Sequence, residues 1–416
     1  MTSSRVLNGT LQSPNVYTLR RHAGRSSLAE IADAWRALAA SLPRRWFHHL
    51  PEWYECQLDA LADDASEIRF YTVHRGRELE AVIPLRPVRL RVMGTMVSVL
   101  SLPFDDHIPF GDIVCRPDAD MDALGAALLD HLERDAGVRW DLLVLPRVLD
   151  GAAGARLVAG APLPNVAAHA QGHCDYVACA DGDDLSRAIS GKLRRDLRRR
   201  GNKLRQIGAV EYVVSNEGEA LHQAYERFLA VEASGWKGRH GAGTAIALHP
   251  RYTHFYRTLL DRFADSSGAE ISELHVGGRC VAAQLALVAD GAWFLMKTGY
   301  DEELSAVAPG NLLFEHTLER LTGAANVDEA NLVSDAAWHQ TWNPQRHAVA
   351  THFVANRTLR GLATVALLRA KERVQHWRDS RRRDGRPAET TGARPRTITP
   401  KGADGSDRKR QPAGIP

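Results

Sequence analysis

The sequence has little of what marks a secreted, membrane-spanning or nucleic-acid-packaging protein. Its five cysteines are an odd number, and only Cys174 and Cys179 lie close together, without C-x-x-C spacing. This argues against a disulfide framework and a zinc site and favours a reducing, cytoplasmic compartment. The longest mostly apolar run, near 92–104, is too short to cross a bilayer, and no apolar signal segment follows Met1. The net charge of +3 is too small for a polycation, so any basic function must be local.

What is present is the composition of a globular protein. The 416 residues are 44% hydrophobic and 25% charged, which is enough for two domains of ordinary size. A hairpin, a loop, a helix and a strand occur in the same order in both halves, with Gly76-Arg77 aligning on Gly278-Arg279 and Asp141 on Asp328. We therefore expect a duplicated α/β unit. Chance is the alternative, because this order of elements is common.

The composition also predicts the boundaries of these units. The stretch 151–164 is rich in Gly, Ala and Pro and reads as a linker, whereas the region beyond 384 has almost no large apolar residue. We expect a flexible arm at 1–25, a first α/β unit at 26–160, a second at 170–355, an amphipathic basic helix at 356–383 and a disordered tail at 384–416. The default for the basic helix is packing on the body; binding a partner or an anionic membrane surface are the alternatives.

The most informative segment runs from Trp293 to Leu321. It reads as an apolar strand, a polar loop ending in Pro309-Gly310, and an amphipathic helix. The first turn of a helix has unpaired N–H groups at the positive end of its dipole, so a pyrophosphate can bind there. A simple turn before a core helix is the competing interpretation. Only the second half has this Pro-Gly; the first half offers 103–113 at the equivalent place and is expected to serve as scaffold or acceptor-binding surface.

A second candidate for anion binding is the basic segment 185–205. Apolar residues recur there every four positions, so one helical face packs while the rest is basic. The basic residues either form an ordinary solvated face or meet a phosphate-bearing substrate, the phosphates of a cofactor or an anionic surface.

Several motifs, taken in order, resemble one family. They are Trp236-Lys-Gly-Arg-His-Gly-Ala-Gly-Thr-Ala245, the hairpin 274–284, Gly299-Tyr-Asp301, Ala308-Pro-Gly310 and Asp335-Ala-Ala-Trp-His-Gln-Thr-Trp342. Together they are similar to GNAT-type acyltransferases of the cellulose-biosynthesis-associated CelD group, which are relatives of the FemAB aminoacyltransferases. The similarity covers roughly 45–355 and is more specific in the second half.

The resemblance implies a fold and a cofactor. The fold would be α/β, with tandem GNAT-like mixed-sheet domains followed by a C-terminal helix. In such folds two central strands splay apart, an acyl-CoA thioester inserts between them, and its pyrophosphate lies on the next helix N-terminus. Acetyl-CoA or another acyl-CoA would then be the co-substrate, with no metal. The residues expected to bind it are Lys297, Thr298, Pro309, Gly310, Asn311 and Leu312.

The chemistry would be attack of an acceptor amine on the thioester, which needs a base, an oxyanion donor and an acid. Candidate catalytic residues are Asp301, Asp335 and His339; Asp301 is otherwise a turn residue and His339 a satisfied histidine. FemAB-like relatives have Asp-x-x-Tyr-Lys-x-x-Trp where this chain has Trp338 and His339, which removes a fixed cation and offers a group that titrates near neutral pH. The expected substrate-binding residues are Trp236, Lys237, Tyr300 and Trp338.

The sequence thus favours a cytoplasmic acyl-CoA-dependent N-acyltransferase. Its expected acceptor is a small amine, such as an amino-sugar precursor of surface polysaccharide. A peripheral position at the inner face of a membrane, through 356–383, is a further expectation. One alternative is aminoacyl transfer from tRNA, with the basic helix at 185–205 contacting RNA phosphates. The other is a non-catalytic assembly factor.

Overall fold

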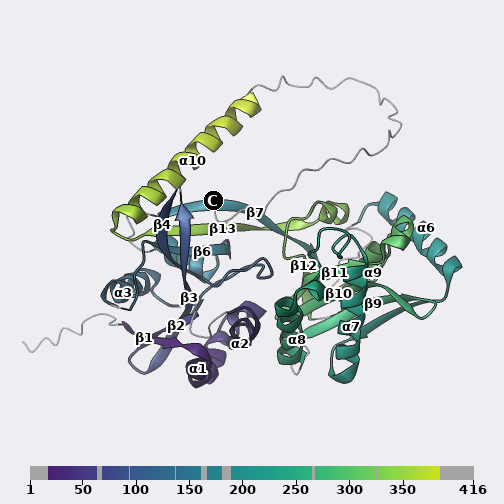
Figure 1. Cartoon of the computed structure of the whole chain (residues 1–416), viewed down its shortest axis with the longest axis horizontal. Helices are drawn as coiled ribbons and strands as arrows, with labels where there is room; N and C mark the ends of the chain where they lie inside the picture. The colour runs from purple at the N-terminus through teal and green to yellow at the C-terminus, as the bar shows by residue number, and fades with distance from the viewer. Residues whose placement is uncertain are drawn as a thin grey trace, which may run out of the picture.

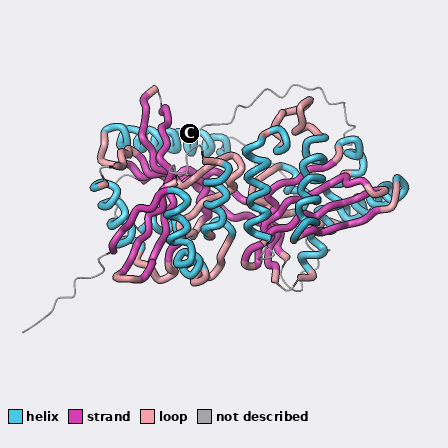
Figure 2. Tube along the Cα trace, turned by 60° about the horizontal axis from the view of Figure 1, so that its bottom comes forward, coloured by secondary structure: helices cyan, strands magenta, loops and turns pink. Residues whose placement is uncertain are grey.

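The computed structural model describes residues 17–62, 68–92, 94–135, 137–160, 166–179, 189–264, 268–324 and 326–384. They form two lobes, one built mainly from residues 17–160 and the other mainly from residues 189–331 (Figure 1). Two long strands, β7 (Val166–Ala178) and β13 (Gln345–Ala355), run from one lobe to the other. Figure 2 shows the strands of both lobes with helices lying in front of them.

The elements of the first half follow a pattern that the second half repeats. The first half contains β1 (Tyr17–Ala23), α1 (Gly24–Ala39), η1 (Phe47–His49), α2 (Pro51–Ala60), β2 (Arg69–Arg75), β3 (Glu78–Val92), β4 (Thr95–Ser101), β5 (Val114–Cys115), α3 (Met121–Arg134), β6 (Leu142–Leu149), α4 (Ala153–Gly160) and β7. The second half contains α6 (Gly191–Ile207), β8 (Val210–Ser215), α7 (Gly218–Ser234), η2 (Ile246–Leu248), α8 (Pro250–Ala264), β9 (Ala269–Val276), β10 (Arg279–Ala289), β11 (Gly291–Tyr300), η3 (Glu302–Val307), α9 (Pro309–Thr322), β12 (Val327–Asn331), η4 (Ala337–Trp342) and β13, followed by α10 (Leu359–Asp384).

The strands of the described residues form one sheet whose order reads alike from both ends. The order is β1-β2-β3-β4-β6-β13-β7-β12-β11-β10-β9-β8. In each half three antiparallel pairings lead to one parallel pairing, β4 with β6 and β11 with β12, and a single α-helix, α3 or α9, lies between the two strands of that parallel pair. The expected duplication is therefore seen in the topology. The two hairpin turns match as 76–77 and 277–278, one residue away from the alignment that the sequence suggested.

The halves exchange their last strands. Strand β7, at the end of the first half, pairs with β12 of the second half, while β13, at the end of the second, pairs with β6 of the first. The two exchanged strands also pair with each other, antiparallel, from Gln345 opposite Tyr176 to Val354 opposite Val166. Each half therefore completes its sheet with a strand that the other half supplies.

Aromatic side chains also join the halves. Phe47 lies 4.9 Å and Trp46 lies 5.0 Å, ring centre to ring centre, from Phe294 of β11, and both contacts are edge-to-face. Trp53 packs on Phe47 at 4.8 Å and on Phe255 of α8 at 5.6 Å. All five side chains are buried. These aromatic side chains thus form a core that is shared between the two halves.

The structure corrects two of the expected boundaries. Residues 17–23 form β1, paired with β2, so the part of the expected arm that the structure describes belongs to the sheet. The expected linker contains α4 up to Gly160, and residues 161–164 lie outside the described residues. The expected helix at 356–383 is present as α10, whereas the expected tail, beyond 384, lies outside the described residues. No helix of the described residues is both long and apolar enough to span a membrane.

Candidate active site

Strands β11 and β12 separate partway along their length. They pair in parallel only from Gly291 to Phe294, opposite Val327 to Asn331, whereas β11 continues beside β10 as far as Tyr300. A β-bulge follows at once, because Leu285 faces Lys297 while its neighbour Ala286 faces Leu295, which leaves Met296 as the extra residue. The structure therefore contains the splayed central pair that the sequence resemblance implies.

A cavity of about 390 Å³ lies at the end of β11, and we call it the cofactor cavity. Its walls come from the end of β11, the start of α9, the end of α7 with the loop that follows, and η4. The residues that line it are Glu232, Gly235, Trp236, Lys237, Gln284, Thr298, Gly299, Tyr300, Glu302, Ser305, Ala308, Gly310, Asn311 and Trp338. All four residues predicted to bind substrate are among them, together with three of the six predicted to bind cofactor.

The start of α9 differs from the expected four-residue cradle. Ala308 has a left-handed backbone, with φ of 49°, and its carbonyl accepts from the N–H of Asn311 at 3.0 Å and of Leu312 at 3.2 Å. Pro309 has no N–H, and the Leu312 side chain is buried in the core. Within 309–312, Gly310 is thus the residue whose N–H has no backbone partner in the described chain. Of the four residues expected to bind an anion, only the Gly310 N–H and the Asn311 side chain are therefore available as donors.

The loop after α7 is anchored to β11 beside the cavity. Lys237 Nζ donates to the carbonyl of Thr298 at 2.9 Å and lies 3.2 Å from Glu232, whose other oxygen accepts from Ile246 N–H at 2.8 Å. Glu232 is buried, so the lysine offsets the cost of burying that carboxylate. Gly299 is required here, because a Cβ on it would lie 2.7 Å from the Cα of Glu232. Trp236, which is 57% exposed, stands at the rim.

Asp301 caps a helix and lies outside both this cavity and the one described below. Its Oδ1 accepts from the N–H of Glu303 at 3.0 Å, and its Oδ2 lies 2.8 Å from Arg279. Both oxygens are therefore occupied at the start of η3.

His339 and Asp335 also lie outside the cofactor cavity. His339 is 1% exposed, and its Nδ1 lies 3.0 Å from Oδ2 of Asp175, a carboxylate that is itself fully buried. Burial lowers the pKa of His339, and the hydrogen bond to Asp175 opposes that shift. Asp335 is exposed. The structure thus places His339 next to Trp338, where it fixes η4 against β7, and the charge of Asp335 acts on His339. Asp301 has separate partners at the start of η3.

Lys297 is separated from its predicted neighbours. It lines a second cavity, of about 300 Å³, that lies between the two halves and that we call the inter-half cavity. Burial, with a contribution from nearby Lys237, lowers the pKa of Lys297 to about 8. The residues around this cavity are Phe104, Asp105, Asp106, His107, Ile108, Pro109, Arg147, Met296, Lys297, Val333 and Ser334.

The basic helix, predicted at 185–205, is α6 from Gly191 onward, with residues 185–188 outside the described part. It packs against η3 and α9, two elements that line the cofactor cavity (Figure 1). Asp196 pairs with Arg199 and Arg200, at 2.5 Å and 2.7 Å. Lys192, Arg194, Arg195 and Arg198 are exposed and have no ion pair in the described residues. The cavity therefore has a strongly cationic neighbour.

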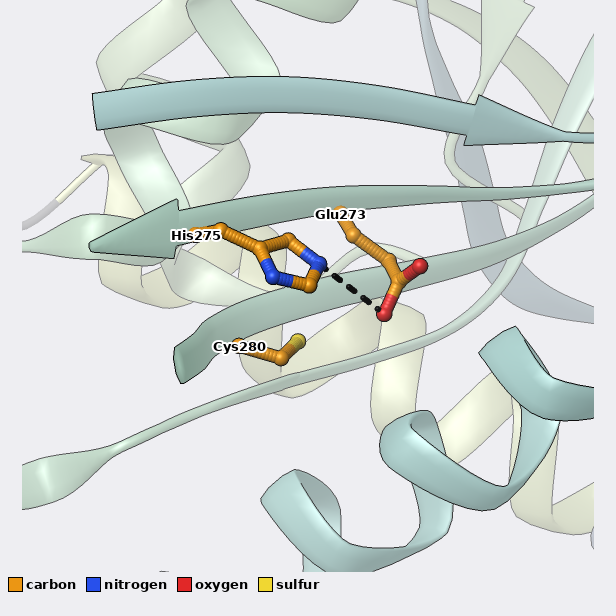
Figure 3. Close-up of side chains that lie close together, drawn as sticks. All are labelled: Glu273, His275 and Cys280. Carbon is orange, nitrogen blue, oxygen red and sulfur yellow. Dashed lines mark ion pairs between the residues drawn. The ribbon is translucent and has the colours of Figure 1, made fainter. Parts of the chain in front are cut away.

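One cluster elsewhere has metal-ligand types. Glu273, His275 and Cys280, on the β9–β10 hairpin, have ligand atoms within 4.8 Å of one another (Figure 3). Arg227 already donates to both oxygens of Glu273, each at 2.7 Å. The Arg227 guanidinium therefore already balances the charge of the Glu273 carboxylate, and none of the three residues lines the cofactor cavity.

Sequence reasoning missed several lining residues. Glu232 and Gln284 stand inside an apolar helix and an apolar strand, where a buried polar residue is the signal that a close reading could have used. In the first half, 104–109 was expected only as a possible acceptor surface, and the structure places it in the inter-half cavity.

Comparisons with known proteins bear on the fold. Residues 191–340 match the acetyltransferase (GNAT) domain family. No curated protein matches the chain. Among solved structures, FemX gives a TM-score of 0.52 at 11% identity, covering 78% of this chain and 96% of FemX. L-PGS from Bacillus licheniformis gives 0.48 at 16% identity, covering 81% and 95%, and a tandem GNAT protein from the clavulanic acid biosynthesis pathway gives 0.44 at 13%, covering 82% and 100%.

The fold expected from the sequence is thereby confirmed. The second half has the GNAT acetyltransferase fold by the family match, and the first half repeats its strand order. The likeness to FemX supports the same fold over both halves. The more specific assignment to the CelD group stays a prediction.

Proposed function

We propose that this chain is an acyl-CoA-dependent N-acyltransferase that transfers an acetyl or longer acyl group to an amine. The observation that supports it most directly is the cofactor cavity, which joins the separated end of β11 to the first turn of α9. A thioester arm needs the separated end of β11, because the freed strand edge offers backbone groups to an extended ligand. A pyrophosphate needs the first turn of α9, because the N–H of Gly310 and the helix dipole favour an anion.

The unpaired cations of α6 support the same ligand. Coenzyme A carries its phosphates at one end, and α6 packs beside both η3 and α9 at the phosphate end of the proposed site. Lys192, Arg194, Arg195 and Arg198 therefore raise the local concentration of an anionic ligand and strengthen its binding at low salt.

A thermal-shift series with CoA esters of graded chain length tests the proposal. An ester at about a hundred times its Kd should stabilise the protein by about 2.7 kcal/mol. The matched pair of variants is Gly310→Trp and Gly310→Ala. A Cβ at this position lies 3.4 Å from Tyr300, an ordinary contact, so the alanine should keep the shift while the indole fills the cavity and removes it.

The outcomes separate cleanly. If no CoA ester shifts the wild type, the proposed function is wrong. If Gly310→Trp folds and keeps the full shift, the ligand binds elsewhere and the assignment of this cavity is wrong.

Finer aspects of the proposal rest on the family resemblance. They are an amino-sugar precursor of surface polysaccharide as the acceptor, a cytoplasmic location, and a peripheral membrane or partner contact through 356–383. They also include 26–160 as a unit that binds no cofactor and 170–355 as the unit that does.

The exposed cations of α6 favour one rival function, aminoacyl transfer from tRNA. That activity should fall steeply between low and moderate salt, because each phosphate contact releases a counterion. A salt-insensitive activity that needs an acyl-CoA would exclude it. A non-catalytic assembly role would be indicated if the protein bound no CoA ester and transferred no group.

A further inference from the structure

We propose that the inter-half cavity binds the acceptor as a cationic primary amine, and that Lys297 is the group that takes the proton from it. This inference rests on the proposed function, because it concerns the second substrate of the same reaction. It gives the first half, which has no Pro-Gly helix start, a part in the chemistry.

The position of the cavity is the first argument. Pairing between β11 and β12 ends at Phe294 and Asn331. The inter-half cavity is lined by residues that begin two positions later on each side of that separation, Met296 with Lys297 and Val333 with Ser334. The residues that follow on β11, 298–300, line the cofactor cavity. The two cavities therefore border one gap between strands, and a thioester held in that gap is within reach of an amine in the inter-half cavity.

The backbone of the cavity wall is the second argument. Val333 has φ of 51° and Arg147 has φ of 52°, a left-handed conformation that a β-branched residue such as valine rarely adopts. Each half contributes one of the two, and Arg147 donates from its guanidinium to the carbonyl of Val333 at 3.4 Å. Such conformations are strained and are concentrated at functional sites. Here both shape the same cavity.

The surroundings of Lys297 are the third argument. Its Nζ lies 5.9 Å from the ring centre of Tyr256, and it has no ion pair with a carboxylate in the described residues. The charged and titratable groups around it, including those that line the same cavity, are Lys237, Glu232, Asp105, Asp106, His107, Arg147 and Tyr256. Burial and the Lys237 cation favour the neutral amine, so near pH 8 about half of the molecules hold a lysine that can accept a proton.

Two carboxylates of the cavity wall favour a cation, and the Arg147 guanidinium of the same wall is engaged by the backbone carbonyls of Pro109 and Val333. Asp106 is exposed and has no ion pair in the described chain, and Asp105 lies 3.8 Å from Arg251. His107, between the cavity and α8, stacks on Tyr252 at 3.7 Å and its Nδ1 lies 3.1 Å from the Tyr256 hydroxyl. Burial lowers the pKa of His107 to about 3, so its imidazole stays neutral. An ammonium entering past Asp105 and Asp106 then meets a neutral lysine.

The step balances without any further reagent. Neutral Lys297 takes one proton from the ammonium, and the freed amine nitrogen attacks the thioester carbonyl carbon. The new C–N bond forms as the carbonyl becomes an oxyanion. When the oxyanion collapses, the C–S bond breaks and the departing thiolate receives the second proton of the amine nitrogen. The products are an amide, free CoA thiol and a protonated Lys297, which returns its proton to solvent.

The test measures release of CoA thiol from acetyl-CoA with glucosamine, spermidine and 2-aminoethanol as probes, using the full chain. In the wild type, kcat/KM should rise with pH up to about pH 8, because Lys297 must be neutral, and should fall again where the free amine loses its own proton. Lys297→Met should lose about a hundredfold or more of kcat and the ionisation near pH 8. Lys297→Arg should not restore the rate, because arginine stays protonated. Asp106→Asn should raise KM for the amine with little change in kcat. The control is Asp130→Asn, at an exposed side chain of α3, which should change neither KM nor kcat.

Each other outcome is decisive. If the acetyl-CoA thermal shift is normal in Lys297→Met and the variant keeps the wild-type pH profile, Lys297 is not the proton acceptor. If wild type binds acetyl-CoA but acylates none of the three amines, the acceptor assignment is wrong. If no CoA ester binds, the proposed function fails, and this inference fails with it.

Discussion

At the scale of single residues, the site depends on glycines that allow close packing. Gly299 lets α7 lie against β11, since a Cβ there would meet Glu232 at 2.7 Å from its Cα and 3.0 Å from its backbone nitrogen. The cofactor cavity at the end of β11 and the Lys237 anchor that lines it both depend on this contact.

We predict that Gly299→Ala destabilises the protein by about 1–3 kcal/mol, the usual cost of forcing extra volume into a packed contact. Urea unfolding measures the change. The control is Gly201→Ala in α6, where a Cβ meets nothing closer than 3.8 Å and alanine is the better helix former, so stability should stay equal or rise by up to about 1 kcal/mol. An unchanged midpoint for Gly299→Ala would contradict the close packing of α7 on β11.

The residues also show what a sequence can and cannot predict. Trp236, Tyr300, Gly310 and Trp338 belong to motifs with fixed spacing, so their presence in one cavity could be expected. The separation of Lys297 from Thr298 follows from strand alternation alone, so the predicted strand already implies it. The shared position of Met296 and Lys297 in one cavity could not be expected, because it follows from the bulge at Met296. A one-residue bulge leaves no mark in composition or periodicity.

At the scale of elements, α6 is the clearest case of a segment whose role depends on its neighbours. Its basic face is visible in the sequence, but its place beside η3 and α9 is a tertiary contact. The same helix on another face of the molecule would be an ordinary solvated helix.

We predict that replacing Lys192, Arg194, Arg195 and Arg198 by glutamine weakens binding of acetyl-CoA by up to about tenfold at low salt, which corresponds to about 1.4 kcal/mol. The difference should shrink at high salt, because these charges are exposed and screened. Calorimetric titration at two salt concentrations measures it. Glutamine at the exposed Arg89 and Arg91 of β3 is the control and should leave affinity unchanged. Equal losses in both variants would show that α6 contributes only net charge.

At the scale of the whole molecule, the exchanged strands make each half depend on the other. A unit at 170–355, expected from the sequence as self-contained, keeps β13 but loses β6, the strand on which β13 pairs over Leu142 to Leu149. The repeat of elements could be read from the sequence. The exchange could not, because pairing partners far apart along the chain leave no local pattern.

We predict that the fragment 180–416, expressed alone, aggregates, because the unpaired edges of β12 and β13 are exposed. Co-expressed with the fragment 1–179, it should purify as a one-to-one complex whose melting temperature rises when acetyl-CoA is added. Size-exclusion chromatography distinguishes the two states. A monomeric, folded 180–416 fragment that binds acetyl-CoA would contradict this dependence.

A strand order that reads alike from both ends has one more implication, which concerns ancestry. Two copies of a single unit, each lending its last strand to the other, would form this same sheet about a two-fold axis between β13 and β7. The strand order of this chain is therefore the one expected from fusion of two such copies. Of the two halves, only the second has Pro-Gly at the start of the helix that lies between its parallel strands.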